Sequence, residues 1–149
     1  MSREFDLDEI ASIRRALDVR PQSSRAERTI DITTTGARTR QPRRIEIWFH
    51  HVDGRWYLSG MPRGRSWYAN LTANPRFIVH LKHGAAFDLP AIARQVDSDT
   101  KRRALSVVLA LQGRSDLGTA GVPPQDPEEW QERSPIVEIE FDDARLRAR

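Results

Sequence analysis

Four arginines lie close together just after a predicted glycine turn, in the segment TTTGARTRQPRR at residues 33–44. A glycine turn exposes main-chain N–H groups, threonine hydroxyls donate hydrogen bonds, and a guanidinium group binds phosphate or carboxylate through two parallel hydrogen bonds. This combination of residue types favours the capture of an anion. The alternative is an ordinary solvated hairpin that carries scattered arginines, and the segment alone does not decide between the two.

A second segment with related chemistry is LSGMPRGRSWYANL at residues 58–71. Two glycines precede the start of a predicted helix, and a helix N-terminus attracts negative charge. The rings of Trp67 and Tyr68 follow directly and offer walls for a flat aromatic ligand. Packing against the protein core is the simpler explanation for these two rings taken alone.

The charge distribution points to the same part of the chain. The 149 residues carry a formal net charge of +3 and contain no cysteine, which excludes disulfides, thiolate metal sites and cysteine nucleophiles. Residues 25–65 hold nine arginines against four acidic residues, whereas residues 113–149 hold five arginines against nine acidic residues. We therefore expect an anion to bind near the one basic segment.

The spacing of apolar residues predicts a single, mainly β domain over residues 1–149. Helices are expected over residues 6–18, 66–74 and 99–112, and strands over residues 28–35, 43–52, 55–59, 76–82, 85–96 and 135–141. Residues 1–27 form an N-terminal helix and linker, residues 113–134 form a long loop, and the charged tail after residue 141 frays. Hairpins and short links favour about six antiparallel strands curled into a small barrel, with helices packed outside.

The order and spacing of these motifs resemble one known family. The pattern joins a TTxGrxsGxPR hairpin, a strand-Asp-Gly-strand hairpin and a WyxNLxANP helix followed by a strand, over roughly residues 30–96. It is similar to the deazaflavin-dependent nitroreductase and quinone reductase family, which has the split β-barrel fold shared with pyridoxamine-phosphate oxidase. The resemblance implies that the chain binds coenzyme F420, a deazaflavin with a phosphate and an oligoglutamate tail. It also implies hydride transfer to a small organic electron acceptor, such as a quinone or a nitroaromatic compound.

The resemblance also implies a set of site residues. The hairpin turn would meet the phosphate and the tail through Thr35, Gly36, Arg38, Thr39, Arg40 and Arg43. The ring system would lie near Ser59, Gly60, Arg65, Trp67 and Tyr68. Tyr57 and Tyr68 are candidate proton donors, and the acidic loop with Trp130 is a candidate for the substrate side. Asn70 recurs in the family helix, where a structural role at the helix–strand junction is expected.

The chain departs from the family pattern at three places. Residues 39–41 read Thr-Arg-Gln where the family often has Lys-Ser-Gly, so the usual glycine is missing. The loop GMPRGRS before the second helix is shorter than the common version. Glu46 stands where many members have an apolar residue or a proline, and we expect it to form a cross-strand ion pair with Arg44 or Arg55.

Two other functions stay open on the sequence. Split-barrel relatives also bind FMN or haem, so the chain could hold FMN or another ligand without turnover. Arginines near Trp48, Trp56 and Tyr57 could form a nucleic-acid-binding barrel surface, although the acidic C-terminal segment argues against a nucleic acid partner.

The remaining predictions concern metal, membrane and assembly. Neighbouring side chains in a strand point to opposite sides, so His50, His51, His80 and His83 do not converge and no metal site is expected. The sequence has no apolar run long enough for a membrane span and no apolar signal core at its start, which favours a cytoplasmic protein. Split barrels commonly pair, so we expect a homodimer.

Overall fold

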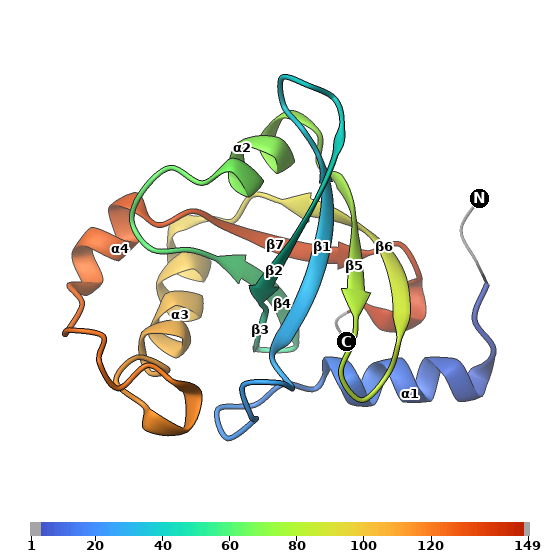
Figure 1. Ribbon diagram of the computed structural model, residues 1–149, viewed down its shortest axis with the longest axis horizontal. Coiled ribbons are helices and arrows are strands. Elements are labelled where there is room, and N and C mark those ends of the chain that lie inside the picture. Colours follow the sequence, from blue (N-terminus) through green and yellow to red (C-terminus); the bar gives the residue numbers. More distant parts are fainter. Residues whose placement is uncertain (1–3, 148–149) are drawn as a thin grey trace.

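The computed structural model describes residues 4–147, and these form one curled antiparallel sheet with helices on its outside (Figure 1). The strands are β1 (Thr29–Thr35), β2 (Pro42–Trp48), β3 (His50–Val52), β4 (Arg55–Ser59), β5 (Arg76–Leu81), β6 (Phe87–Arg94) and β7 (Ile136–Phe141). The helices are α1 (Leu7–Leu17), α2 (Ser66–Ala73), α3 (Ser98–Leu109) and α4 (Pro127–Arg133), with two short 3₁₀ helices, η1 (Ser115–Leu117) and η2 (Ala144–Leu146). No helix within residues 4–147 is long and apolar enough to cross a membrane.

The strands lie in the order β2-β1-β5-β6-β7-β4-β3, so two strands that are consecutive in the chain lie at opposite ends of the sheet. The sequence predicted one continuous strand over residues 43–52, and the structure divides it at Phe49. The Phe49 N–H donates to the carbonyl oxygen of Arg28 at 3.0 Å, and the Phe49 side chain is buried. Because Phe49 alone separates β2 from β3, the two ends of the sheet must come close together, and the sheet therefore curls.

The curled sheet encloses the main hydrophobic core. Ile30 and Ile32 of β1 are buried in it, whereas Asp31 and Thr33, which alternate with them, are only partly covered, as strand alternation requires. Helix α1 covers part of this core with apolar residues at helical spacing. Its start is fixed by Asp6, whose carboxylate accepts the N–H of the third helical residue at 2.8 Å.

A second core cluster lies under α3 and α4, and it corrects the prediction of a loop over residues 113–134. Asp126 accepts the N–H of Glu128 at 3.0 Å and Pro127 occupies the first helical position, so the last part of this segment is helix α4. Trp130 on α4 is only 2% exposed and packs in the same cluster as Tyr57. Trp130 is therefore a core residue, which is contrary to its predicted place on the substrate side.

The charged tail after residue 141 is also more structured than predicted. Asp143 accepts the N–H of Arg145 at 3.0 Å, and Arg145 Nη2 donates to the carbonyl oxygen of Phe5 at 3.0 Å. The side chain of Leu146 is buried in the main core. The prediction of fraying is therefore wrong for residues 142–147, and residues 148–149 lie outside the described part of the chain.

Candidate functional site

A groove of about 440 Å³ lies between the turn that joins β1 to β2 and the first turns of α2. In Figure 1 this is the upper end of the molecule, where the β1–β2 hairpin extends beyond the rest of the sheet beside α2. The lining residues are Thr34, Gly36, Ala37, Arg38, Thr39, Arg43, Ile45, Ser66, Trp67, Ala69 and Asn70. The groove therefore brings together the two segments that the sequence singled out for anion binding.

The hairpin turn is closed by hydrogen bonds between its own main-chain groups. The Gly36 N–H donates to the Gln41 carbonyl oxygen at 2.8 Å, and the Arg40 N–H donates to the Gly36 carbonyl oxygen at 3.0 Å. A Cβ atom on Gly36 would clash with Thr39 Oγ1, so a larger residue here would force the Thr39 side chain to move. Arg40 has a φ of +56°, the left-handed conformation that glycine adopts most readily. The turn thus keeps a left-handed residue although the usual glycine of the family pattern is missing.

Asn70 connects α2 to this turn. Its side-chain oxygen accepts the N–H of Ala37 at 2.9 Å, and its amide nitrogen donates to Thr34 Oγ1 at 3.1 Å. Asn70 is buried, and so is Thr34. Asn70 therefore has a structural role, because its side chain links α2 to the β1–β2 turn and so holds the two walls of the groove together.

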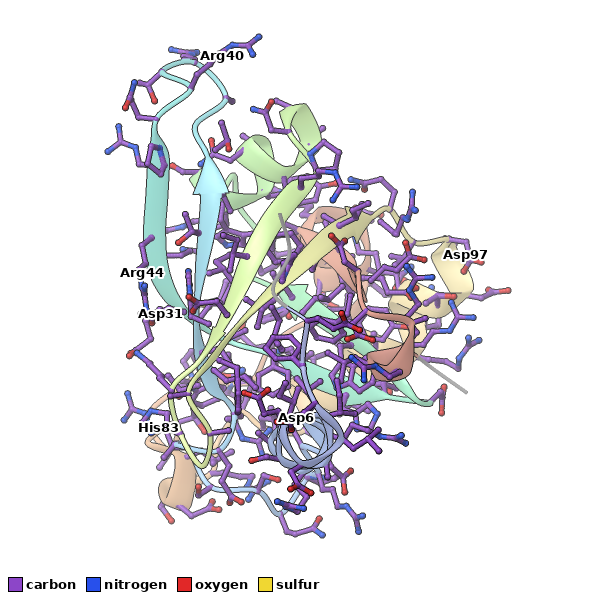
Figure 2. The ribbon with its side chains drawn as sticks, turned by 90° about the vertical axis from the view of Figure 1, so that its right-hand side faces the viewer. Asp6, Asp31, Arg40, Arg44, His83 and Asp97 are labelled. Carbon is purple, nitrogen blue, oxygen red and sulfur yellow. The ribbon has the colours of Figure 1, made fainter. Side chains whose placement is uncertain are left out.

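Three arginines at the hairpin tip provide the positive charge of the site. Arg38 and Arg43 line the groove, and Arg40 lies at the very end of the hairpin (Figure 2). All three are exposed, and none forms an ion pair with a carboxylate of residues 4–147. Their charge is therefore free to attract an anion, to which the N-terminal end of α2 adds the partial positive charge of a helix terminus.

Two cations near the base of the same hairpin, Arg44 of β2 and Lys82 just after β5, are already paired with carboxylates. Arg44 Nε lies 2.9 Å from Asp31 Oδ2, and Lys82 Nζ lies 2.7 Å from Asp31 Oδ1. Hydrogen bonds from Lys82 and Arg44 lower the pKa of Asp31. Glu46 pairs with Lys82, so the prediction that it pairs with Arg44 or Arg55 is wrong. The partner of Arg55 is Glu138 at 3.2 Å.

The groove also has apolar lining residues. Trp67 is buried at 8% exposure and Ile45 is 37% exposed, and Ala69 lies on the exposed side of α2. The Trp67 ring contacts the ring of Tyr68 edge to face, with their centroids 5.9 Å apart. A ligand in the groove would therefore meet both guanidinium groups and apolar surface.

The predicted residues before α2 do not line the groove. Ser59 ends β4, and the Gly60 N–H donates to the carbonyl oxygen of Pro135 at 3.1 Å. The Arg65 side chain covers Gly60, since a Cβ atom on Gly60 would lie 3.4 Å from Arg65 Nε. Burial, together with the charge of Arg63, lowers the pKa of Arg65. These contacts explain the need for a small residue at position 60.

Three other predicted residues lie outside the groove lining. Tyr57 is 3% exposed in the second core cluster, and burial raises its pKa. Tyr68 turns away from the groove, where its hydroxyl donates to Gln95 Oε1 at 3.1 Å. Thr35 contributes its carbonyl oxygen to the side-chain amide of Asn74 at 3.4 Å. The structure therefore does not bring either candidate proton donor to the groove.

Several lining residues were absent from the predicted set, although periodicity could have found them. Ser66, Ala69 and Asn70 have the i, i+3 and i+4 spacing of one helix face. Thr34 continues the inward alternation of Ile32, and Ile45 lies opposite Ile32 in the β1–β2 register.

The histidines occupy three separate environments. His50 is buried beside Arg28, and burial together with this charge lowers its pKa to about 4. His51 stacks on Trp56 with ring centroids 4.8 Å apart. His80 lies between Thr33 Oγ1 at 2.7 Å and Asp88 Oδ1 at 2.6 Å. Among residues 4–147 no group of three histidine or acidic side chains is arranged to hold a metal ion.

Solved structures of other proteins confirm the split β-barrel fold. A putative 5-nitroimidazole antibiotic resistance protein from Bacteroides thetaiotaomicron is 14% identical over 93% of this chain and 81% of its own, with a TM-score of 0.58. A putative pyridoxamine 5'-phosphate oxidase from Listeria innocua is 12% identical over 78% of this chain and 85% of its own, with a TM-score of 0.55. An F420-H2 dependent reductase, FDR-A, is 20% identical over 76% of this chain and 94% of its own, with a TM-score of 0.53.

The fold thus defines a split-barrel protein, and a groove lined by arginines lies between its β1–β2 turn and α2. The family model of the F420H(2)-dependent quinone reductases matches residues 11–114, which is more than half of the chain. The chain belongs to this family, and the predicted resemblance is confirmed. No curated protein matches the chain.

Proposed function

We propose that this protein is an F420H2-dependent reductase that binds the deazaflavin in the groove between the β1–β2 turn and α2. The observation that carries the proposal is the joint lining of this groove by unpaired guanidinium groups and by apolar side chains. Membership of the F420H(2)-dependent quinone reductase family supports the choice of cofactor. The residues fit the cofactor chemically, because it combines anionic groups with a flat aromatic ring system.

The anionic part of the cofactor would be held by the hairpin tip. Arg38 and Arg43 line the groove without a carboxylate partner in the described chain, so each can donate two parallel hydrogen bonds to phosphate or carboxylate. Thr39 adds a hydroxyl beside them. Arg40 lies at the tip and outside the lining, so we assign it long-range attraction of the tail and no direct contact.

The ring system would lie against the apolar wall formed by Trp67 and Ile45. When bound, the reduced deazaflavin supplies a hydride, so the protein has to bind, orient and partly desolvate the reactants. No side chain has to act as a catalytic base. Neither Tyr57 nor Tyr68 lines the groove, so we assign proton delivery to solvent.

The test is a titration of the purified protein with F420, followed by tryptophan fluorescence, and a parallel titration with FMN. Substitution of both Arg38 and Arg43 by alanine should weaken F420 binding about 100-fold, because each charge-assisted hydrogen bond contributes about 1.5–3 kcal/mol. The matched control is Arg44→Ala, which removes the same charge from the neighbouring residue. Arg44 pairs with Asp31 outside the groove, so its loss should change the affinity less than twofold.

Three outcomes would contradict the proposal. Tighter binding of FMN than of F420 would favour a flavin protein. An equal loss of affinity in the double variant and in Arg44→Ala would mean that Arg38 and Arg43 do not contact the ligand. Salt-sensitive binding of an oligonucleotide without F420 affinity would favour the nucleic-acid alternative.

Three finer predictions accompany this proposal. The acceptor is a small organic molecule such as a quinone or a nitroaromatic compound, and turnover with each class in the presence of F420H2 distinguishes them. The protein works in the cytoplasm. It pairs as a homodimer, for which the exposed edge strand β2 offers a surface, and sedimentation of the full chain measures this.

A further inference from the structure

A second groove, of about 330 Å³, lies between the C-terminal end of α1, the β3–β4 hairpin and η2. Its lining residues are Arg14, Leu17, Asp18, His51, Gly54, Trp56, Arg145, Leu146 and Arg147. In Figure 1 these elements lie at the lower end of the molecule, far from α2 and from the tip of the β1–β2 hairpin. The groove shares no lining residue with the candidate cofactor site.

The charge of this second groove is positive. Its lining contains three arginines and one carboxylate, that of Asp18. Asp18 is already paired with Arg20 at 2.8 Å, and Arg145 is paired with Asp143 at 2.8 Å. The other two lining arginines, Arg14 and Arg147, belong to neither of these pairs, although the charge of Arg147 helps to lower the pKa of Asp143 and that of Glu140.

Neither of these two arginines forms an ion pair within the described residues. Arg147 donates only to main-chain oxygens, those of Phe141 at 2.8 Å and Asp142 at 3.2 Å. Arg14 is exposed on the last turn of α1. Two guanidinium groups that line one groove and form no ion pair within residues 4–147 favour an anionic occupant.

The floor of the groove is apolar and rigid. Leu17 and Leu146 are almost completely buried, and the Trp56 indole N–H donates to the Leu17 carbonyl oxygen at 2.8 Å. The Trp56 ring is further fixed by His51, which lies parallel to it, and by Phe141, which meets it edge on at 5.4 Å. A preformed apolar floor with fixed rings binds an apolar body at little cost in conformational entropy.

From this combination we propose that the second groove binds a small organic anion whose apolar body rests on Leu17, Trp56 and Leu146 and whose carboxylate or sulfonate meets Arg14 and Arg147. The volume suits a compact ligand of one or two rings. Such a ligand would not compete with the cofactor for space, because the two grooves lie at opposite ends of the sheet. The site would therefore let a metabolite of this class bind together with the cofactor.

The test uses 2-naphthoate as the anionic probe and the neutral 2-naphthamide as its match in size and shape. Nuclear magnetic resonance of the full-length protein resolves the tryptophan indole N–H signals, and a Trp56→Phe variant assigns that of Trp56. The naphthoate should shift the Trp56 signal in a saturable way and leave that of Trp67, in the first groove, unmoved. The naphthamide should bind at least about tenfold more weakly, since it lacks the charge.

A pair of variants on one helix then tests the charge. Arg14→Gln should weaken naphthoate binding about tenfold, whereas Arg15→Gln, which removes the same charge from the next residue outside this groove, should leave it unchanged. Both positions are exposed and glutamine suits a helix, so both variants should fold. An unmoved Trp56 signal at millimolar naphthoate, equal binding of the two probes, or equal effects of the two substitutions would each overturn the proposal.

Discussion

The cations around the base of the β1–β2 hairpin differ in state from those at its tip. Around the base, Arg44 of β2 and Lys82, which follows β5, are paired with Asp31, and Arg28 is 2% exposed and donates to main-chain oxygens of residues 20, 21 and 23. At the tip, Arg38 and Arg40 are exposed without a carboxylate partner among residues 4–147, and Arg40 lies at the end of the hairpin (Figure 2).

The difference shows how one hairpin separates folding from binding. Cations at the base contribute to structure, because their hydrogen bonds are made within the chain and their charge is compensated or buried. Cations at the tip make no such contacts, so their removal should cost little stability, and removal of those that line the groove should cost much ligand affinity. A net charge summed over the whole segment, as read from the sequence, does not distinguish the two groups.

The base should be sensitive to acid through His50, which is buried next to Arg28. Its pKa is lowered to about 4, whereas an unfolded histidine titrates near 6.5. Between these values the unfolded chain binds a proton that the folded protein does not bind, so stability falls as the pH falls. We expect the free energy of unfolding to fall by about 3 kcal/mol from pH 6.5 to pH 4, at about 1.4 kcal/mol per pH unit.

Urea unfolding of the His50→Gln variant over the same pH range measures this contribution. The variant should show a flatter pH dependence, whatever its stability at pH 7. His83→Gln is the matched control, because this histidine is exposed in the turn between β5 and β6, and it should keep the steep dependence. A wild-type slope in His50→Gln would contradict the assignment of the acid sensitivity to the base.

The joint between the hairpin tip and α2, formed by the hydrogen bonds of Asn70, should show the next largest loss of stability on substitution. Asn70→Ala leaves the Ala37 N–H and the Thr34 hydroxyl without their partner and should cost about 2 kcal/mol in thermal or urea unfolding. The loss of this tie should also weaken F420 binding several-fold, since the hairpin tip and α2 would no longer be held in one arrangement.

Asn74→Ala provides the comparison on the same helix. Its amide makes one long contact, 3.4 Å from the Thr35 carbonyl oxygen, so its removal should cost only a few tenths of a kcal/mol. If the two asparagine variants lose stability and affinity equally, the joint does not depend on the Asn70 bonds.

Much of the fold could be predicted because its strands alternate and its turns use glycine. The alternation of Ile30 and Ile32 with polar residues indicated β1, and the Asp53-Gly54 pair indicated the β3–β4 hairpin. The groove could be predicted in part, since the glycine turn and the start of α2 were both recognised. The division of one predicted strand at Phe49 could not, because residues before Phe49 pair with β1 and residues after it pair with β4, and these partners are set by the folded sheet.

Other features escaped for a related reason. Helix α4 lies among prolines and acidic residues, which do not predict a helix. A helix this short depends on tertiary packing for its stability, and Trp130 supplies that packing against α3. The ion pairs of the hairpin depend on which strand lies beside β1, so Lys82 of the β5–β6 region was not foreseen as the partner of Glu46.

The smallest expected effect concerns the backbone of the tip itself. Arg40 has a φ of +56°, which costs an L-residue about 1 kcal/mol relative to glycine. Glycine also has greater conformational freedom in the unfolded chain, and this offsets part of the gain in stability. Arg40→Gly should therefore raise the free energy of unfolding by about 0.5 kcal/mol, as measured by urea unfolding. Because the Arg40 side chain lies outside the groove lining, F420 affinity should change less than about threefold.

Arg38→Gly should have the opposite effects, a slightly lower stability and a clearly weaker F420 affinity, because Arg38 lines the groove and Arg40 does not. Arg38 has no positive φ, so glycine should lower stability slightly there through unfolded-state entropy. The same substitution removes a guanidinium from the groove lining and should weaken F420 binding about tenfold. A loss of affinity in Arg40→Gly as large as that in Arg38→Gly would mean that the tip attracts the ligand by its total charge, and that the groove does not select which arginine binds.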